Sequence, residues 1–179
     1  MYQAVYELRI PKARVGSLIA KKGKDKTILE KHTNTSIKVS AEGEVEITGE
    51  GLGGYLCGEI VKAIGRGFNP QVALQLLEDN YGLEIIDLKS YAGNNKKKLT
   101  RIKSRIIGIK GKAWKVIERL TECDMSVYGN TVSLLGNHEK LYIAFRGVEK
   151  LLMGSPHGNV YGFLEREMKK LRTHHTQKN

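Results

Sequence analysis

A short segment, Gly108-Ile109-Lys110-Gly111, combines glycine and lysine in a pattern that suits phosphate binding. Glycine has no Cβ, so Gly108 and Gly111 can adopt positive φ and let another molecule approach the backbone closely. A helix is expected directly after this turn, and a helix N-terminus presents unpaired N–H groups at the positive end of the helix dipole. Lys110 and Lys112 add full charges at the same place. These residues therefore predict a seat for phosphate groups.

A near copy of this segment lies 88 positions earlier in the chain. At that constant offset, six residues of the first copy recur in the second: Lys22, Gly23, Lys24, Glu30, Thr33 and Val39 fall on Lys110, Gly111, Lys112, Glu118, Thr121 and Val127. A repeat with a fixed period is strong evidence that one structural unit was built twice. We therefore expect two related units, each with a basic turn that leads into a helix.

The two turns differ at their first position, where Ala20 stands in the first copy and Gly108 in the second. Alanine disfavours positive φ and places a methyl group on the surface that a phosphate must approach. Lys21 and Lys22 preserve the attraction for phosphate without restoring that geometry. We therefore predict that the second turn is the principal clamp and that the first contributes electrostatics or mainly structure.

Hydrophobic periodicity predicts the elements that hold these turns. In the first unit we expect a strand at 4–10, helices at about 13–19 and after the turn, a hairpin of strands at 37–39 and 45–47, and a helix at about 55–64. In the second unit we expect a strand at 83–88, helices before the turn and at about 113–120, a hairpin around 129–130, and a helix at 138–152. Asn69-Pro70 and Ser155-Pro156 have the residue types that begin helices.

This order predicts an α+β fold of two tandem β-α-α-β-β-α domains, each with a three-stranded antiparallel sheet and three helices, followed by a C-terminal helix. We expect the first domain at 1–67, a linking helix at 68–82, and the second domain with the C-terminal helix at 83–179.

Composition favours an anionic partner, because 30 Lys and Arg outnumber 19 Asp and Glu for a net charge of +11. No stretch has the apolar length needed to span a bilayer, and the start of the chain carries no signal-peptide pattern. Cys57 and Cys123 are solitary and match no metal-ligand spacing. We therefore expect a cytoplasmic protein without a metal or cofactor, and no membrane partner.

The segments beside the turns supply further candidates for nucleic-acid contact. Apolar strand residues could line a groove for unstacked bases, and basic residues near the turns could either contact phosphate or simply solvate a helix face. The candidate groove residues are Ile37, Val39, Met125 and Val127, and the basic candidates are Arg14, Lys24, Lys103, Arg105, Lys115 and Arg119. Trp114 could stack on a base or be partly buried. His157 is expected at a helix start, with a hydrogen bond to RNA or between domains as the second option.

Both units resemble type I KH domains, whose GxxG loop clamps about four nucleotides of single strand. The signature segments are 19–24 and 107–112, and the segments 61–68, 103–108, 126–129 and 155–161 resemble archaeal KH-domain ribosomal-RNA processing proteins. These are relatives of the eukaryotic assembly factor named partner of Nob one. The resemblance implies binding of the 3′ region of small-subunit rRNA during maturation, while a Nob-type endonuclease does the cutting.

Two alternatives stay open at this point. The chain could be an adaptor for a protein of ribosome maturation or translation initiation, with RNA binding secondary. More remotely, Gly49-x-Gly51-x-x-Gly54 satisfies the dinucleotide-binding pattern and could belong to a nucleotide-dependent enzyme. That pattern needs a parallel βαβ unit, whereas the flanking strands look antiparallel. Since no catalytic constellation appears at recognisable spacing, we expect no enzyme activity.

Overall fold

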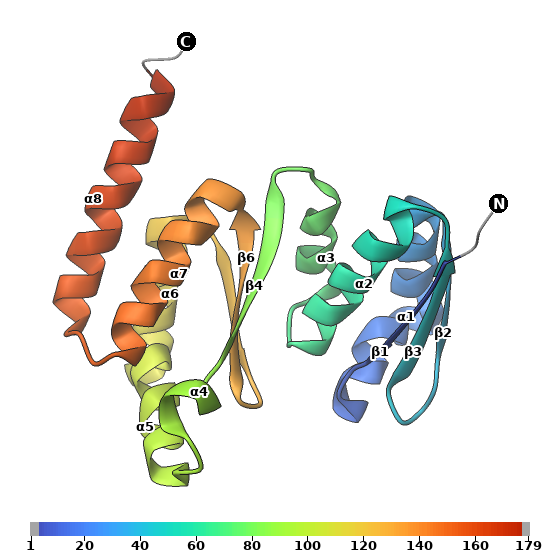
Figure 1. Ribbon diagram of the computed structural model, residues 1–179, viewed down its shortest axis with the longest axis horizontal. Coiled ribbons are helices and arrows are strands. Elements are labelled where there is room, and N and C mark those ends of the chain that lie inside the picture. Colours follow the sequence, from blue (N-terminus) through green and yellow to red (C-terminus); the bar gives the residue numbers. More distant parts are fainter. Residues whose placement is uncertain (1–3, 177–179) are drawn as a thin grey trace. The chain divides into compact units, whose positions relative to one another are not determined.

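The computed structural model describes residues 4–176, apart from the side chains of 20–24 and 175. It divides between Asp79 and Asn80 into two units, each with its own sheet and helices (Figure 1). The segment expected to link the domains, 68–82, therefore falls mostly within the first unit. No helix among the described residues is both long enough and apolar enough to cross a membrane.

The first unit is a three-stranded antiparallel sheet in the order β1-β3-β2 with its long helices on one face (Figure 1). Its elements are β1 (Ala4–Arg9), α1 (Lys12–Thr33), β2 (Thr35–Val39), β3 (Glu44–Gly49), α2 (Leu52–Gly65), α3 (Pro70–Ala73) and the 3₁₀ helix η1 (Leu74–Leu77). Alternate residues of β3 are buried, because one face of the sheet packs on the helices. Leu18 and Leu29 of α1 and Ile47 of β3 are all almost fully buried and belong to this core.

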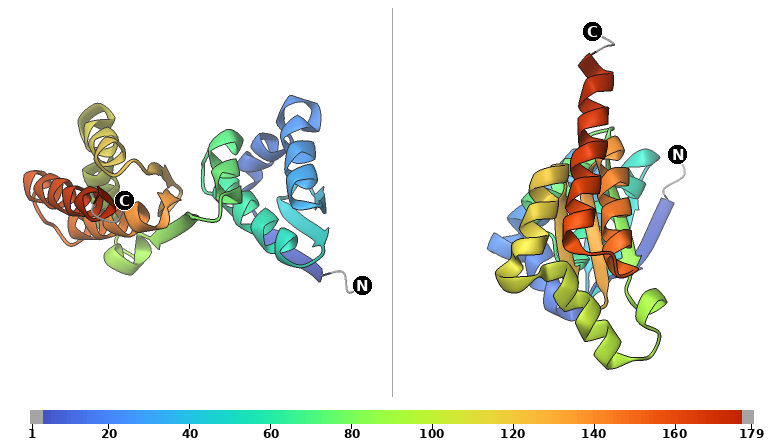
Figure 2. Two further views of the ribbon diagram at one scale, coloured as in Figure 1. Left: turned by 90° about the horizontal axis from the view of Figure 1, so that it is seen from above. Right: turned by 90° about the vertical axis from the view of Figure 1, so that its left-hand side faces the viewer.

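The second unit repeats this sheet in the order β4-β6-β5, again antiparallel. Its elements are β4 (Tyr81–Asp87), α4 (Lys89–Ala92), α5 (Lys96–Ile107), the 3₁₀ helix η2 (Ile109–Gly111), α6 (Lys112–Thr121), β5 (Asp124–Tyr128), β6 (Thr131–Asn137), α7 (His138–Leu152) and α8 (His157–Thr176). Helices α6 and α7 cover the sheet, and α8 packs on both of them. Figure 2 shows that the C-terminal part of α8 extends beyond the rest of this unit.

The two units share the hydrogen bonds that join a helix to the following strand. A Glu30 carboxylate oxygen accepts the Ile37 backbone N–H at 2.7 Å, and a Glu118 oxygen accepts the Met125 N–H at 2.9 Å. These pairs are separated by the offset of the sequence repeat. The predicted α+β class and the duplicated antiparallel sheets are confirmed.

Two predicted features of the first unit are wrong. The expected break at 20–23 does not interrupt the helix, because α1 is helical throughout Lys12–Thr33. Ala20 and the lysines after it have high helix propensity, and position 20 lacks the glycine that would leave the helix easily. The linking helix expected within 68–82 is only α3, followed by the tighter η1. Its predicted start is confirmed, since Asn69 Oδ1 accepts the Gln71 N–H at 3.0 Å.

The strands around Gly49 exclude the dinucleotide alternative. β3 pairs antiparallel with both β1 and β2, and α2 follows it directly. A dinucleotide fold needs the strand before the glycine-rich turn to lie in a parallel βαβ unit. Gly51 instead takes φ of 56° at the position just before α2, so these glycines form a turn into the helix.

Candidate nucleic-acid interface

The turn between α5 and α6 has an unusual backbone. Gly108 has φ 71° and ψ 177°, Lys110 has φ 52° and ψ 33°, and Gly111 has φ 74° and ψ 12°. The Gly108 N–H donates to the Ser104 carbonyl at 2.8 Å and ends α5, and the Gly111 N–H donates to the Gly108 carbonyl at 3.2 Å. Three of the four residues therefore lie at positive φ, which turns the chain sharply between the helices.

The two glycines of this turn are needed for different reasons. A Cβ on Gly108 would lie 2.6 Å from the Cβ of Ala113 and 2.8 Å from its backbone nitrogen, so the fold itself requires glycine there. A Cβ on Gly111 would meet no described atom within 4 Å. Gly111 therefore faces open space, and at this position a ligand can approach the backbone.

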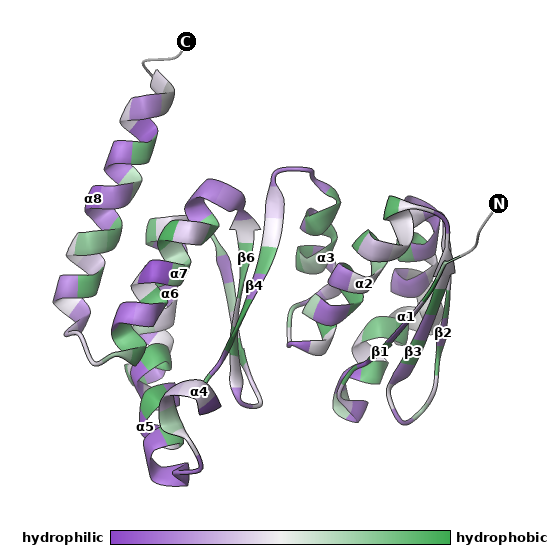
Figure 3. Cartoon of the chain, in the orientation of Figure 1, coloured by the Kyte–Doolittle hydropathy of each residue, from purple (hydrophilic) through white to green (hydrophobic). Residues whose placement is uncertain are grey.

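The surroundings of the turn are exposed and strongly basic. Ile109 is 80% exposed, and the side chains of Lys110 and Lys112 are exposed beside it. The first turn of α6 holds no acid, and no side chain within the described chain caps its N-terminus. From 96 to 119 the sequence has ten Lys and Arg but one acid, Glu118, which is occupied by the Met125 N–H. Figure 3 shows hydrophilic residues interspersed with hydrophobic ones along α5. Dipole and side chains therefore favour an anion at the same place.

The predicted basic residues of α5 diverge to opposite sides of the helix. Lys103 Nζ donates to Asn130 Oδ1 at 3.1 Å, which ties α5 to the turn between β5 and β6. Arg105 points the other way: its Nε donates to the Leu151 carbonyl at 3.1 Å, and its Nη2 donates to the Ser155 carbonyl. Arg105 thus has a structural role that sequence reasoning missed, and its contact with RNA stays a prediction.

Arg14 has the same kind of contact in the first unit. Its Nε donates to the Ile64 carbonyl at 2.8 Å and its Nη2 to the Phe68 carbonyl at 2.7 Å. The guanidinium therefore holds the C-terminal end of α2. The candidates at positions 20–24 (Ala20, Lys21, Lys22, Gly23 and Lys24) have side chains outside the described residues, so their role stays a prediction.

Two of the four predicted groove residues are wrong. Met125 is 3% exposed and Ile37 is 2% exposed, so both belong to the cores rather than to a surface for bases. Residues two apart on a strand share one face, so Val39 and Val127 lie on the same side as Ile37 and Met125 but are less deeply covered. Val127 and Val39 are half-buried and stay candidates. Lys115 and Arg119 are exposed on α6, without an ion pair in the part of the chain described.

The two ambiguous residues of the second unit are now placed. Trp114 is half-buried and packs against the core, as its alternative of partial burial predicted. His157 begins α8, and its Nε2 lies 2.8 Å from the Arg105 carbonyl oxygen. His157 therefore stabilises the connection from α7 to α8 within its own unit. The Gly129-Asn130 turn signal could have indicated Asn130 as a partner for this surface, but sequence reasoning did not identify it.

The two cysteines of the chain are buried thiols. Burial raises the pKa of the Cys123 thiol to about 11, so it stays protonated at neutral pH, and burial also raises the pKa of Cys57. No group of three His, Cys, Asp or Glu side chains within the described parts is placed to hold a metal ion. At the Gly108–Gly111 turn, the N-terminus of α6 and the exposed Lys110 and Lys112 offer noncovalent contacts to an anion.

Known proteins share both the sequence and the fold of this chain. Residues 82–169 match a family described as eukaryotic-type KH domain, KH-domain type I (second domain of PNO1), and residues 5–53 match the KH domain family. The KH domain-containing protein MJ0443 of Methanocaldococcus jannaschii is 46% identical over 170 residues, which covers 92% of this chain and 74% of that protein.

A eukaryotic relative and a solved structure extend the likeness. The pre-rRNA-processing protein pno1 of Aspergillus fumigatus is 37% identical over 112 residues, or 60% of this chain and 44% of that protein. A chain in the crystal structure of the a/eIF2alpha-aDim2p-rRNA complex from Pyrococcus horikoshii is 41% identical, with a TM-score of 0.88 over 95% of this chain and 97% of that one.

Proposed function

The chain belongs to the family of KH-domain proteins related to Pno1 and Dim2, and on that premise we propose that it binds single-stranded RNA without cutting it. The RNA we propose is the 3′ region of small-subunit rRNA during ribosome maturation. Support comes from a relative named for pre-rRNA processing and from a similar chain solved in a complex with rRNA. The single observation that carries the proposal is the exposed, basic turn at Gly108–Gly111, where Gly111 is open to approach.

The turn acts on the sugar-phosphate backbone of the strand. A phosphate sits against the backbone at Gly111 and the N-terminus of α6, where the dipole attracts negative charge. Lys110 and Lys112 contact the phosphates on either side, and the half-buried Val127 offers apolar surface to a base. A KH loop clamps about four nucleotides, and only a single strand leaves its bases free to enter such a groove.

The test is a titration of RNA with a double charge reversal in the turn. Lys110→Glu with Lys112→Glu should weaken the affinity for a single-stranded RNA from the 3′ end of an archaeal small-subunit rRNA by about tenfold or more, measured by fluorescence anisotropy at fixed salt. Lys169→Glu with Lys170→Glu is the matched control, because it makes the same change of charge on the exposed surface of α8. Equal losses in the two variants would contradict a specific clamp.

A second measurement separates binding from other activities. Log affinity of the unaltered protein should fall steeply with log salt, because lysines displace counterions from the strand. The same RNA should stay full length on a denaturing gel after incubation with the protein. Cleavage of the RNA would contradict the noncatalytic role.

We also propose that the protein works in the cytoplasm beside a Nob-type endonuclease that cuts the RNA it holds. A pull-down with purified endonuclease, with and without the rRNA fragment, tests this partner. Retention that needs neither the RNA nor the Gly108–Gly111 turn would favour the adaptor alternative instead.

A further inference from the structure

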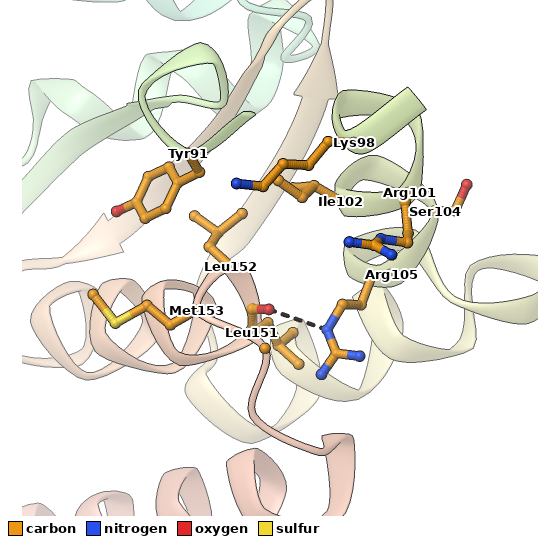
Figure 4. Close-up of a pocket in the computed structure, with 10 residues that line it drawn as sticks. Tyr91, Lys98, Arg101, Ile102, Ser104, Arg105, Leu151, Leu152 and Met153 are labelled. Atoms are coloured by element: carbon orange, nitrogen blue, oxygen red, sulfur yellow. Dashed lines mark hydrogen bonds between the residues drawn. The ribbon is translucent and has the colours of Figure 1, made fainter. Parts of the chain in front are cut away.

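A second surface of the KH2 unit (Asn80–Thr176) forms a groove between α5 and the last turn of α7 (Figure 4). This groove has a volume of about 790 Å³, within the range of about 300–1,000 Å³ that is usual for ligand sites. We call it the Arg101 groove. Its lining residues include Tyr91, Lys98, Arg101, Ile102, Leu152 and Met153.

The Arg101 groove is separate from the Gly108–Gly111 turn. Lys98, Arg101 and Arg105 are three and four residues apart, so they share one side of α5. Arg105 reaches from this side to the connection between α7 and α8, whereas Lys103 reaches from the other side to Asn130. A ligand in the groove therefore contacts a different face of α5 from the one tied to the β5–β6 turn.

The floor of the groove is apolar and its rim is cationic. Ile102 is 6% exposed and Leu152 is 8% exposed, while Met153 beside them is 71% exposed. Figure 4 shows the Lys98 and Arg101 side chains directed over this floor from α5. Neither side chain has an ion pair or hydrogen bond among the described residues, and no acid lines the groove. An exposed methionine adapts its shape to varied apolar partners.

The backbone around the groove argues against a phosphodiester as its ligand. The last turn of α7 contributes carbonyl groups, at the negative end of the helix dipole. One of these carbonyls, that of Leu151, is already held by Arg105. No turn like Gly108–Gly111 presents N–H groups here, so the positive charge comes only from long side chains above an apolar surface. Such a surface suits carboxylates that flank a large apolar side chain.

We propose that the Arg101 groove binds a short acidic segment of a partner protein, whose apolar side chain rests on Ile102, Leu152 and Met153 while its carboxylates pair with Lys98 and Arg101. Arginine binds carboxylates in a bidentate manner, and the buried floor removes the apolar side chain from water. The proposal is independent of RNA binding at the turn.

The test uses methyl-labelled protein and three synthetic peptides. The first peptide has acidic residues around a central Leu-Phe pair, the second has the same composition with the acids moved to one end, and the third has Gln and Asn in place of the acids. We expect the first to bind with a Kd tighter than about 1 mM and to shift the methyl signals of Ile102, Leu152 and Met153, but not that of Ile109.

Two variants locate the interaction. Lys98→Glu with Arg101→Glu should weaken the affinity for the first peptide by about tenfold or more. The Lys169→Glu with Lys170→Glu control should leave that affinity unchanged. Met153→Glu should abolish peptide binding and leave RNA affinity unchanged, because this exposed residue lies outside the turn. Unchanged methyl spectra elsewhere confirm that each variant is folded.

Three results would overturn the proposal. The first is that the first peptide does not bind at concentrations up to about 1 mM. The second is that all three peptides bind equally. The third is that single-stranded RNA shifts the groove methyl signals as much as the first peptide does. None of these results depends on whether the Gly108–Gly111 turn binds RNA, so failure here is distinct from failure of the proposed function.

Discussion

The two KH units have the same hydrogen bonds and backbone conformation where α1 meets β2 and where α6 meets β5. They differ in the preceding helical region, where the second unit has a turn between α5 and α6 and the first does not. In both, a threonine hydroxyl bonds back to its own helix at 2.8 Å, from Thr33 to the Leu29 carbonyl and from Thr121 to the Ile117 carbonyl. In both, the next residue is left-handed, Asn34 at φ 51° and Glu122 at φ 56°. These contacts lie in the helix-to-strand connection, so we infer that the sheet requires them.

The turn between the helices follows a different rule. The second unit breaks its helix with Gly108 at φ 71°, whereas the first continues as α1 through position 20, where the residue is alanine. Both sheets keep the same strand order and antiparallel pairing despite this difference, although the connection between β5 and β6 is two residues shorter than that between β2 and β3. The comparison indicates that the fold tolerates either connection, so the sheet does not require the sharp basic turn of the second unit.

Arg14 of α1 and Arg105 of α5 make the same kind of contact from positions that do not correspond in the sequence repeat. Each arginine donates Nε to a carbonyl in the last turn of α2 or α7 and Nη2 to a carbonyl beyond that helix, although the sequence repeat does not align Arg14 with Arg105. Position 105 corresponds to Ser17, one helical turn after Arg14. The contact, rather than the residue number, is what both units preserve.

The largest expected effect comes from removing the glycine that distinguishes the second turn. Gly108→Val should destabilise the protein by about 2–3 kcal/mol, because its Cβ would collide with Ala113 and its φ is left-handed. Urea unfolding monitored by circular dichroism measures this loss. Gly16→Val, where a Cβ meets nothing within 4 Å, is the control and should cost much less. Similar losses of stability in the two variants would mean that a side chain at position 108 is no more costly than one at position 16.

The next effect compares the two basic segments directly. Lys110→Glu with Lys112→Glu should reduce RNA affinity by about tenfold or more, and Lys21→Glu with Lys22→Glu should reduce it by less. The physical reason is that the second segment leaves its helix at Gly108 and adds the open backbone of Gly111 to its charges. Anisotropy titrations at one salt concentration give the ranking, and equal or reversed losses would refute it.

A smaller effect tests why the first helix is continuous. Ala20→Gly should lower the free energy of unfolding by about 1 kcal/mol, the usual cost of glycine inside a helix, and should leave RNA affinity nearly unchanged. Chemical denaturation and the same RNA titration measure the two quantities. A marked gain in RNA affinity would show that the absence of glycine at position 20 is by itself enough to prevent this segment from binding RNA.

The smallest effect concerns Glu122, which stands where the first unit has Asn34. Hydrogen bonds from Lys140 and Arg172 lower the pKa of Glu122. Because the folded pKa is lower than the unfolded value of about 4.3, the stabilisation is present above that pH and is lost as the pH falls through the folded pKa. Glu122 is exposed, so the contribution is small. Glu122→Gln should slightly reduce stability at pH 7 and not at pH 2, and an equal loss at both would contradict this account.

The sequence predicted the repeated unit, both sheets and the turn at Gly108, because residue types determine these features locally. Ala113, Ile117 and Asn69 occupy the positions that helix periodicity and capping indicate. Period-two alternation groups Ile37 with Val39 and Met125 with Val127, but it does not show how deeply each residue of that face is buried, so Met125 and Ile37 were misplaced. The contacts of Arg14 and Arg105 span 50 and 46 residues, and pattern reasoning has no access to such pairs. The Arg101 groove depends on the same long-range packing.

The left-handed backbone of Lys110 has a consequence for the kinetics of binding. A lysine held at φ 52° adopts a conformation that the free chain rarely visits, and the folded unit imposes it before any ligand arrives. Such preorganisation means that association need not order the loop, which reduces the entropic cost of forming the complex. Encounter rates should then be governed by diffusion and long-range attraction rather than by a slow rearrangement of the protein.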